Sequence, residues 1–184
     1  LVWIAAGLFF GPLLLLGLLV QAWPGTVHLF LEPGQIADIE AMYGPGVKQL
    51  GAREADADFG MFGFYIWNNV KIGFQTFATG VTFGVGTVLF LLFNGVQIGT
   101  VAGHLVQAGL ARSFFSFVSG HSALELTAIV LSGAAGLKLG LALIAPGSLT
   151  RSAALAEAGR VAGRIAGGAA LMFCAAAFVE AFWS

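Results

Sequence analysis

A run of 40 residues, from Ile72 to Ala111, contains a single ionisable side chain, that of His104. As one helix the run would extend about 60 Å, roughly twice the thickness of the hydrocarbon layer of a membrane. The run is therefore too apolar for a typical soluble core and too long to cross a bilayer once. It predicts two membrane-spanning helices joined by a turn. Asn94-Gly95 is the clearest turn signal, so we expect spans at 72–93 and 95–111.

The rest of the chain supports the same class of protein. Of the 184 residues, 58% are hydrophobic and only 9% are charged, which predicts an all-α membrane protein, because a helix satisfies its own backbone hydrogen bonds in lipid. Further apolar segments predict spans at 2–22, 121–144 and 164–183. The expected fold is one transmembrane domain, a bundle of about five helices. Because the chain is already apolar at Leu1 and lacks a starting methionine, we expect the full protein to have a further N-terminal part.

Charged residues predict how the chain is oriented in the membrane. The loop 23–67 carries six acidic and two basic residues, whereas the segment 145–164 carries three arginines and one glutamate. Short loops rich in Lys and Arg stay in the cytoplasm. The basic loop 145–163 is therefore expected inside and the loop 23–67 outside. The net charge of −1 excludes a polybasic surface for nucleic acid.

The long outer loop contains one amphipathic stretch, "EPGQIADIEAMY". Pro33 is suited to the first turn of a helix, and Ile36, Ile39 and Met42 recur on one face. This pattern predicts a short amphipathic helix lying against the membrane surface.

Glycines recur at intervals of four residues within the predicted spans. In membranes, where the hydrophobic effect does not drive helices together, such ladders allow close backbone approach. We interpret them as helix packing within the chain, with a homodimer contact as the alternative. The predicted packing residues are Gly80, Gly84, Gly95, Gly99, Gly103, Gly159, Gly163 and Gly167.

Ionisable residues inside a membrane segment are costly, so each is a candidate functional residue. His121 and Glu125 are four residues apart and therefore share one face of their helix. Under the orientation above, the polar residues of four spans lie at one depth, in the outer half of the membrane. We expect them to form a buried cluster of Asn68, Asn69, His104, Gln107, His121, Glu125 and Glu180.

The residue types in this cluster are compatible with three roles. The cluster can be a hydrogen-bonded network that pins helices together, or a site where His and Glu carry an ion or proton. As a third alternative, His104, His121, Glu125 and Glu180 supply nitrogen and oxygen ligands of the kinds that zinc prefers. The chain has neither an H-E-x-x-H motif nor a Gly-x-Ser-x-Gly motif. We therefore expect no catalytic residues and no bound cofactor.

Two segments resemble a known family. The residues "NNVKIGFQTFATGVTFGVGTVLFLLFNGVQIGTVAG", 68–103, and "FVSGHSALELTAIVLSGAAGLKLG", 117–140, are similar to the stage II sporulation protein M family of bacterial membrane proteins. The resemblance implies a multi-pass protein of the bacterial cytoplasmic membrane. In spore formers it implies a partner of another membrane protein and of a peptidoglycan-degrading enzyme during engulfment, where the protein localises the complex.

The first functional hypothesis is therefore a membrane scaffold or assembly factor of the cell envelope, whose partners are the lipid bilayer and other envelope membrane proteins. An ion- or proton-coupled transporter that uses the His/Glu cluster is the alternative. An intramembrane metal-dependent hydrolase is the third hypothesis.

Overall fold

The computed structural model describes residues 1–44 and 55–183, and every regular element in this part of the chain is a helix. The long helices are α1 (Val2–Ala22), α3 (Ala55–Ala78), α4 (Val85–Gln107), α6 (Ser122–Ile144) and α7 (Arg151–Trp183). Shorter elements connect them: η1 (Pro24–Leu29), α2 (Pro33–Tyr43), η2 (Thr79–Val81) and α5 (Ala111–Val118). Four helices, α1, α4, α6 and α7, are long and apolar enough to cross a membrane by length and composition. The predicted fold class, an all-α membrane protein, is confirmed.

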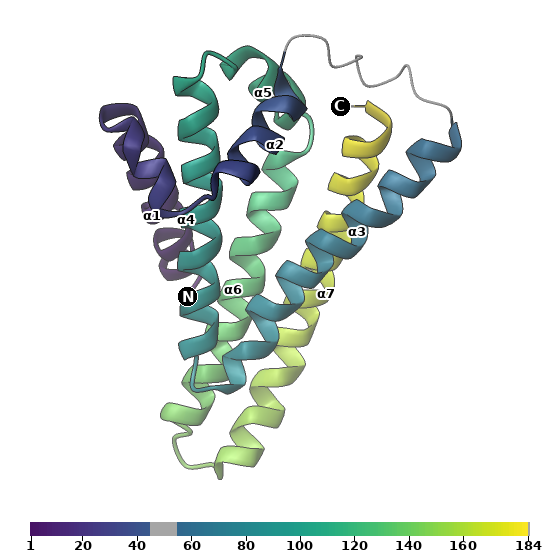
Figure 1. The fold of residues 1–184 in the computed structure, drawn as a ribbon. Coiled ribbons are helices and arrows are strands. Elements are labelled where there is room, and N and C mark those ends of the chain that lie inside the picture. Colours follow the sequence, from purple (N-terminus) through teal and green to yellow (C-terminus); the bar gives the residue numbers. More distant parts are fainter. Residues whose placement is uncertain (45–54, 184) are drawn as a thin grey trace.

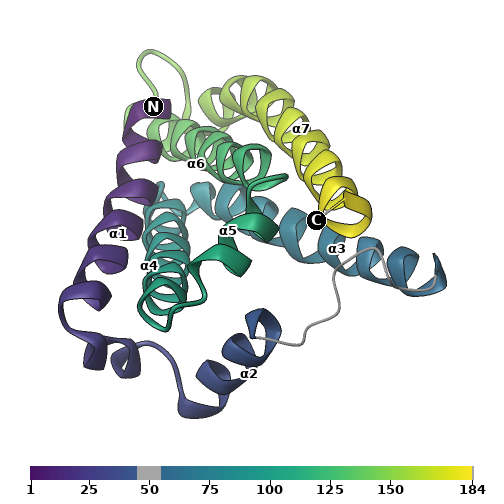
Figure 2. The ribbon, with the colours of Figure 1, turned by 90° about the horizontal axis from the view of Figure 1, so that it is seen from above.

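The long helices form a bundle in which α6 contacts α1, α3, α4 and α7 (Figure 1). Seen along the bundle, α1 and α4 lie side by side, and α6 lies between this pair and α7 (Figure 2). The elements η1, α2 and α5 lie at one end of the bundle, together with the C-terminal end of α7 (Figure 1). The η2 turn and the α6–α7 link lie at the other end. We call η1, α2 and α5 the end layer.

Helices α1 and α4 pack through a glycine ladder. A Cβ atom on Gly95, Gly99 or Gly103 would meet the backbone of Phe9, Leu13 or Gly17, respectively. Residue numbers rise together in these pairs, so the two helices run parallel. At the end of the interface, the Gln21 side-chain amide donates a hydrogen bond of 2.6 Å to the Gly103 carbonyl oxygen. The predicted glycine ladder on α4 is thus in close contact with the backbone of α1.

The turn inside the long apolar run lies at residues 79–84, and the predicted turn at Asn94-Gly95 is wrong. Asn94 lies in the middle of α4, where its side chain donates a 2.7 Å hydrogen bond to the Phe90 carbonyl oxygen one turn earlier. Gly95 serves helix packing instead of a turn. The predicted spans 72–93 and 95–111 therefore give way to α3 and α4, whose boundary comes earlier in the chain.

The real turn is fixed by local geometry and by α6. Phe83 and Gly84 have positive φ angles of 56° and 81°, which reverse the chain direction. A Cβ atom on Gly80 would meet the Gly136 backbone, and one on Gly140 would meet the Gly84 backbone. The backbone of the turn can press into α6 only because glycines occupy both sides of the contact.

Helix α7 is longer than the predicted span 164–183, because most of the predicted basic loop 145–163 is helical. Only residues 145–150 link α6 to α7. Ala158 and Ala162 pack against Ala135 and Leu139 of α6. Alanine has the highest helix propensity, and the contact with α6 buries the face of α7 on which Ala158 and Ala162 lie. With 33 residues, α7 is about 50 Å long, so it extends beyond a hydrocarbon layer of about 30 Å.

The end layer contains the predicted amphipathic helix and one unpredicted element. Helix α2 begins with Pro33 in its first turn and a capping box formed by Glu32 and Gln35. Ile36 is buried, whereas Met42 is 61% exposed. The segment after α4, expected as a simple link, forms α5, which buries Phe114.

Candidate functional site

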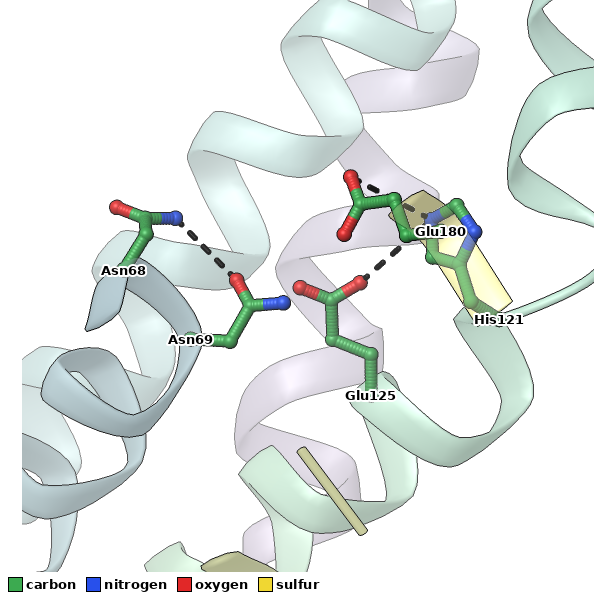
Figure 3. A network of polar contacts seen from close by, with 5 residues as sticks. All are labelled: Asn68, Asn69, His121, Glu125 and Glu180. Carbon is green, nitrogen blue, oxygen red and sulfur yellow. Dashed lines mark hydrogen bonds and ion pairs between the residues drawn. The ribbon is translucent and has the colours of Figure 1, made fainter. Parts of the chain in front are cut away.

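Five polar residues meet near the end layer, and we call them the polar cluster: Asn68, Asn69, His121, Glu125 and Glu180 (Figure 3). The first two come from α3, His121 immediately precedes α6, Glu125 lies in the first turn of α6, and Glu180 lies near the end of α7. Five of the seven polar residues expected to cluster are therefore close to one another.

The position of His121 follows from the start of α6. Its backbone carbonyl oxygen accepts hydrogen bonds from the amides of Leu124 and Glu125, at 3.0 and 3.2 Å. Glu125 lies where the partial positive charge of a helix N-terminus favours a carboxylate. The local sequence thus places an imidazole and a carboxylate together at the start of one membrane helix.

His121 brings carboxylates from two helices together. Its Nε2 atom lies 3.9 Å from Glu125 Oε2 and 3.9 Å from Glu180 Oε1. The His121 side chain is only 3% exposed, against 23% for Glu125 and 11% for Glu180. Both distances exceed hydrogen-bond length, so the contacts are electrostatic. The cluster links the start of α6 to the end of α7.

Two polar atoms of the cluster have no hydrogen-bond partner among the residues that the structure describes. They are Asn69 Nδ2, which is a donor, and Glu180 Oε2, a carboxyl oxygen. The Asn69 side-chain oxygen accepts a 3.3 Å hydrogen bond from the Asn68 amide, and Figure 3 shows the Asn69 amide nitrogen turned toward Glu125. A buried polar atom without a partner is costly, so the cluster has unused capacity for hydrogen bonding.

His104 lies apart from the polar cluster. Its Nε2 atom is 2.8 Å from Glu40 Oε1, which joins the end of α4 to α2. Gln107, one turn later, is exposed. The expected single cluster of seven residues is thus divided between two places, because α2 supplies an acid that the sequence reasoning did not include.

Glu40 and Tyr43 are the residues that sequence reasoning missed. The Tyr43 ring packs edge-on against Phe114 and Phe117 of α5, with ring centroids 5.5 and 5.9 Å apart. Phe117 in turn packs edge-on against the His121 ring at 5.3 Å. Their spacing from Ile36, four and seven residues, is a sequence signal for one helix face.

The arrangement of donors does not support the metal alternative. In residues 1–44 and 55–183, no group of three or more His, Cys, Asp or Glu side chains could hold a metal ion. The four proposed ligands do not converge, because His104 is paired with Glu40.

The remaining glycines differ in their surroundings. Gly80 and Gly84 pack against α6, as described above. Among the described residues, no atom of another element lies within 4 Å of a Cβ atom placed on Gly159, Gly163 or Gly167. This second ladder on α7 is therefore not in close contact with another helix, and Gly167 lines a hollow between α3 and α7.

In the described part of the chain, two of the hollows between helices have no residue of the polar cluster in their lining. One, of about 210 Å³, lies between α3 and α7, where Phe74, Phe77 and Phe173 contribute to its wall. The other, of about 340 Å³, lies beside the turn at 79–84 and is lined by apolar residues of α1, α4 and α6 and by the turn itself. Neither is a polar passage leading from the cluster.

The chain was compared with known proteins, with solved structures and with protein families. An uncharacterised protein of Methanocaldococcus jannaschii is 30% identical over 73 residues, which is 39% of this chain and 41% of that protein. The chain thus matches less than half the length of this relative. No solved structure matches the chain. The profile of the family "Stage II sporulation protein M" matches residues 1–184. The chain, a multi-pass helical membrane protein, belongs to the stage II sporulation protein M family.

Proposed function

We propose that this protein is a membrane scaffold that assembles other proteins of the cell envelope, and that its end layer is the surface that holds them. The observation that carries the proposal is the end layer itself, a structured helical surface at one end of an apolar bundle (Figure 1). Family membership is consistent with this role, because the resemblance implies a protein that localises a complex.

The contacts of the end layer support a role in holding partners. Helix α2 is tied to α4 by the His104–Glu40 pair and to α5 by Tyr43. While α2 is in place, these contacts hold α2 and α5 in one relative position. A pre-positioned surface binds partners at a lower entropic cost than a disordered loop does.

In this proposal the polar cluster has a structural role. His121 holds a carboxylate of α6 and a carboxylate of α7 at equal distances. Such a link fixes the ends of two helices directly beneath α5, whose Phe117 contacts His121. The cluster therefore acts as a brace that maintains the shape of the end layer.

We further propose that the end layer faces the extracytoplasmic side and the 145–150 link faces the cytoplasm. Glu32, Asp38 and Glu40 are exposed in the end layer, whereas Arg151 and Arg160 are exposed at the start of α7. The positive-inside rule then favours this orientation. Partners on the extracytoplasmic side include enzymes that act on the cell wall.

Site-specific photo-crosslinking in native membranes tests the proposal. A benzophenone amino acid is placed at Asp38 or Ser113, both exposed in the end layer, and at Ser148 in the opposite link as the control. We expect discrete adducts with envelope membrane proteins or cell-wall enzymes from the first two positions and not from the third. Adducts with lipid alone at Asp38 and Ser113 would contradict a scaffold role, as would solute flux through liposomes containing only this protein.

A further inference from the structure

Helix α2 is attached to the rest of the protein through one face. Ile36, Glu40 and Tyr43 are spaced four and three residues apart and therefore lie along one stripe of the helix. This is the spacing by which an amphipathic helix docks into a groove of another protein. Each of the three side chains contacts a different receiving surface on the end of the bundle.

The first receiving surface is apolar. Ile36, 8% exposed, packs in one cluster with Val20 of α1 and Val27 of η1. Ile39 packs beside it and is partly buried. Burial of these apolar side chains favours attachment of the start of α2 to the bundle.

The second receiving surface is polar and belongs to α4. His104 is 11% exposed at its side chain and its Nε2 atom lies 2.8 Å from Glu40 Oε1. Glu40 itself remains 46% exposed. The pair therefore selects an acidic side chain at this position but remains accessible to water, which weakens it.

The third receiving surface is aromatic and belongs to α5. Phe114 and Phe117 both present ring faces or edges to Tyr43, at centroid distances of 5.5 and 5.9 Å. Aromatic pairs of this geometry select for a ring on the partner.

These contacts bury little of α2. Of its eleven residues, only Ile36 is classed as buried, and Asp38, Ala41 and Met42 are exposed. The helix is also separate from its neighbours in the chain, because it starts from an extended Glu32 and ends at an extended Gly44. Among the residues that the structure describes, α2 is held chiefly by buried Ile36 with partly buried Ile39, by half-exposed Glu40 and by the ring of Tyr43. A short helix held in this way can leave its place without unfolding the bundle.

We infer that α2 is a releasable helix, and that the surface beneath it is a docking site for an amphipathic helix with an apolar, an acidic and an aromatic side chain at positions i, i+4 and i+7. In the structure α2 occupies this site from within the same chain. A partner helix with the same three side chains takes its place when α2 leaves. The inference concerns the chain by itself and does not depend on the proposed scaffold function.

Peptide binding to the purified full chain in nanodiscs tests the inference. The probe is a fluorescent peptide of residues 32–44, EPGQIADIEAMYG. The receptor is the chain with Ile36→Asp, which detaches α2 but leaves Val20, His104, Phe114 and Phe117 intact. Fluorescence anisotropy should show saturable binding to this receptor. The native chain should bind the peptide at least tenfold more weakly, because its own α2 competes at a high effective concentration.

Two matched peptides test whether binding uses the predicted contacts. A Glu40→Gln peptide should bind about fivefold more weakly, as the loss of one ion pair implies. An Asp38→Asn peptide loses the same charge from the exposed side of the helix and should bind like the parent. In a receptor that also carries His104→Gln, the parent and Glu40→Gln peptides should bind equally well, since the pair is then absent from both.

Each outcome decides the question. No saturable binding to an Ile36→Asp receptor that melts like the native chain would overturn the inference. Equal losses with the Glu40→Gln and Asp38→Asn peptides would also overturn it, since charge alone would then explain binding. Equal binding to the native and Ile36→Asp chains would place the peptide elsewhere and overturn it too. If the Ile36→Asp chain does not fold, a Tyr43→Ala receptor provides the same comparison.

Discussion

At the scale of single residues, the polar cluster links α6 to α7, but its glutamate side chains are costly to bury. Two glutamates lie in a part of the protein where charge is expensive, and both are near one imidazole. Within the described part of the chain, Asn69 Nδ2 and Glu180 Oε2 have no hydrogen-bond partner. The contribution of each of these residues to stability therefore depends on the presence of the others.

Removal of His121 should destabilise the fold more than removal of either carboxylate. His121→Ala leaves Glu125 and Glu180 near each other without the group between them. We expect a loss of about 1–3 kcal/mol in the free energy of unfolding, the usual cost of leaving a buried polar group unpaired. Thermal or denaturant unfolding in detergent measures it.

A second substitution separates this electrostatic explanation from simple loss of packing. The double variant His121→Ala, Glu180→Gln should recover part of the lost stability, because one of the two facing carboxyl groups is replaced by an amide that carries no charge. An equal or larger loss in the double variant would show that His121 acts through packing against Phe117.

Glycines with and without neighbours should respond in opposite directions to alanine. The added Cβ of Gly99→Ala meets the Leu13 backbone, whereas that of Gly163→Ala meets no atom of another described element within 4 Å. Gly99→Ala should lower the melting temperature because α1 must move away from α4. Gly163→Ala should raise stability by about 0.5–1 kcal/mol, the usual gain from replacing an unpacked helical glycine.

The pair of variants also tests for a second copy of the chain. If Gly163→Ala lowers the melting temperature, or shifts the protein to a smaller size in analytical ultracentrifugation, the glycine ladder on α7 is a dimer contact. The prediction above would then be wrong.

At the scale of elements, the turn between α3 and α4 depends on a tertiary partner. Asn94-Gly95 is a stronger local turn signal than the residues at 79–84, yet it lies inside a helix. In a membrane, glycine inside a helix is useful because it lets another backbone approach, here that of α1. The turn forms instead at residues 79–84, where the glycines of α6 allow its backbone to pack closely.

Substitutions at the two positions should differ accordingly. Gly84→Ala forces a side chain into a left-handed conformation at φ 81° and should cost about 1–2 kcal/mol. Asn94→Ala removes a hydrogen bond to the carbonyl of its own helix and should have a smaller effect, since alanine is a better helix former. Unfolding curves of the two variants measure the difference, and a greater loss for Asn94→Ala would contradict our account of the turn.

At the scale of the whole molecule, the elements that connect the long helices gather at the two ends of the bundle (Figure 1), and the proposed orientation puts these ends on opposite sides of the membrane. The end layer carries exposed acids, and the opposite end carries the exposed arginines that begin α7. The proposed function requires the end layer to be accessible to extracytoplasmic partners.

Cysteine labelling in intact cells tests this orientation. In a Cys174→Ser background, Asp38→Cys should react with a membrane-impermeant maleimide added outside, and Ser148→Cys should react only after the cells are permeabilised. Both native side chains are exposed, so accessibility within the protein does not limit either reaction. The reverse pattern would place the end layer in the cytoplasm and exclude extracytoplasmic partners.

Several features of the protein follow from the sequence alone. Low charge and long apolar runs determine that the chain is helical and belongs in a membrane, because lipid leaves the backbone no other partner. Pro33 and the spacing of Ile36 and Ile39 are sufficient to predict α2, since a helix start and a helix face are local properties. Local sequence also places His121 and Glu125 at the start of α6. For this reason part of the polar cluster could be predicted.

Only the tertiary structure decided which residues meet. His104 and His121 lie at similar depth in the sequence-based topology, but Glu40 pairs with the first while Glu125 and Glu180 surround the second. The same holds for the glycines, because the ladder on α4 packs against α1, whereas the ladder on α7 makes no close contact with another described helix. Spacing along the chain fixes the face on which a side chain lies. The neighbour on that face is set by long-range packing, which a single helix does not encode.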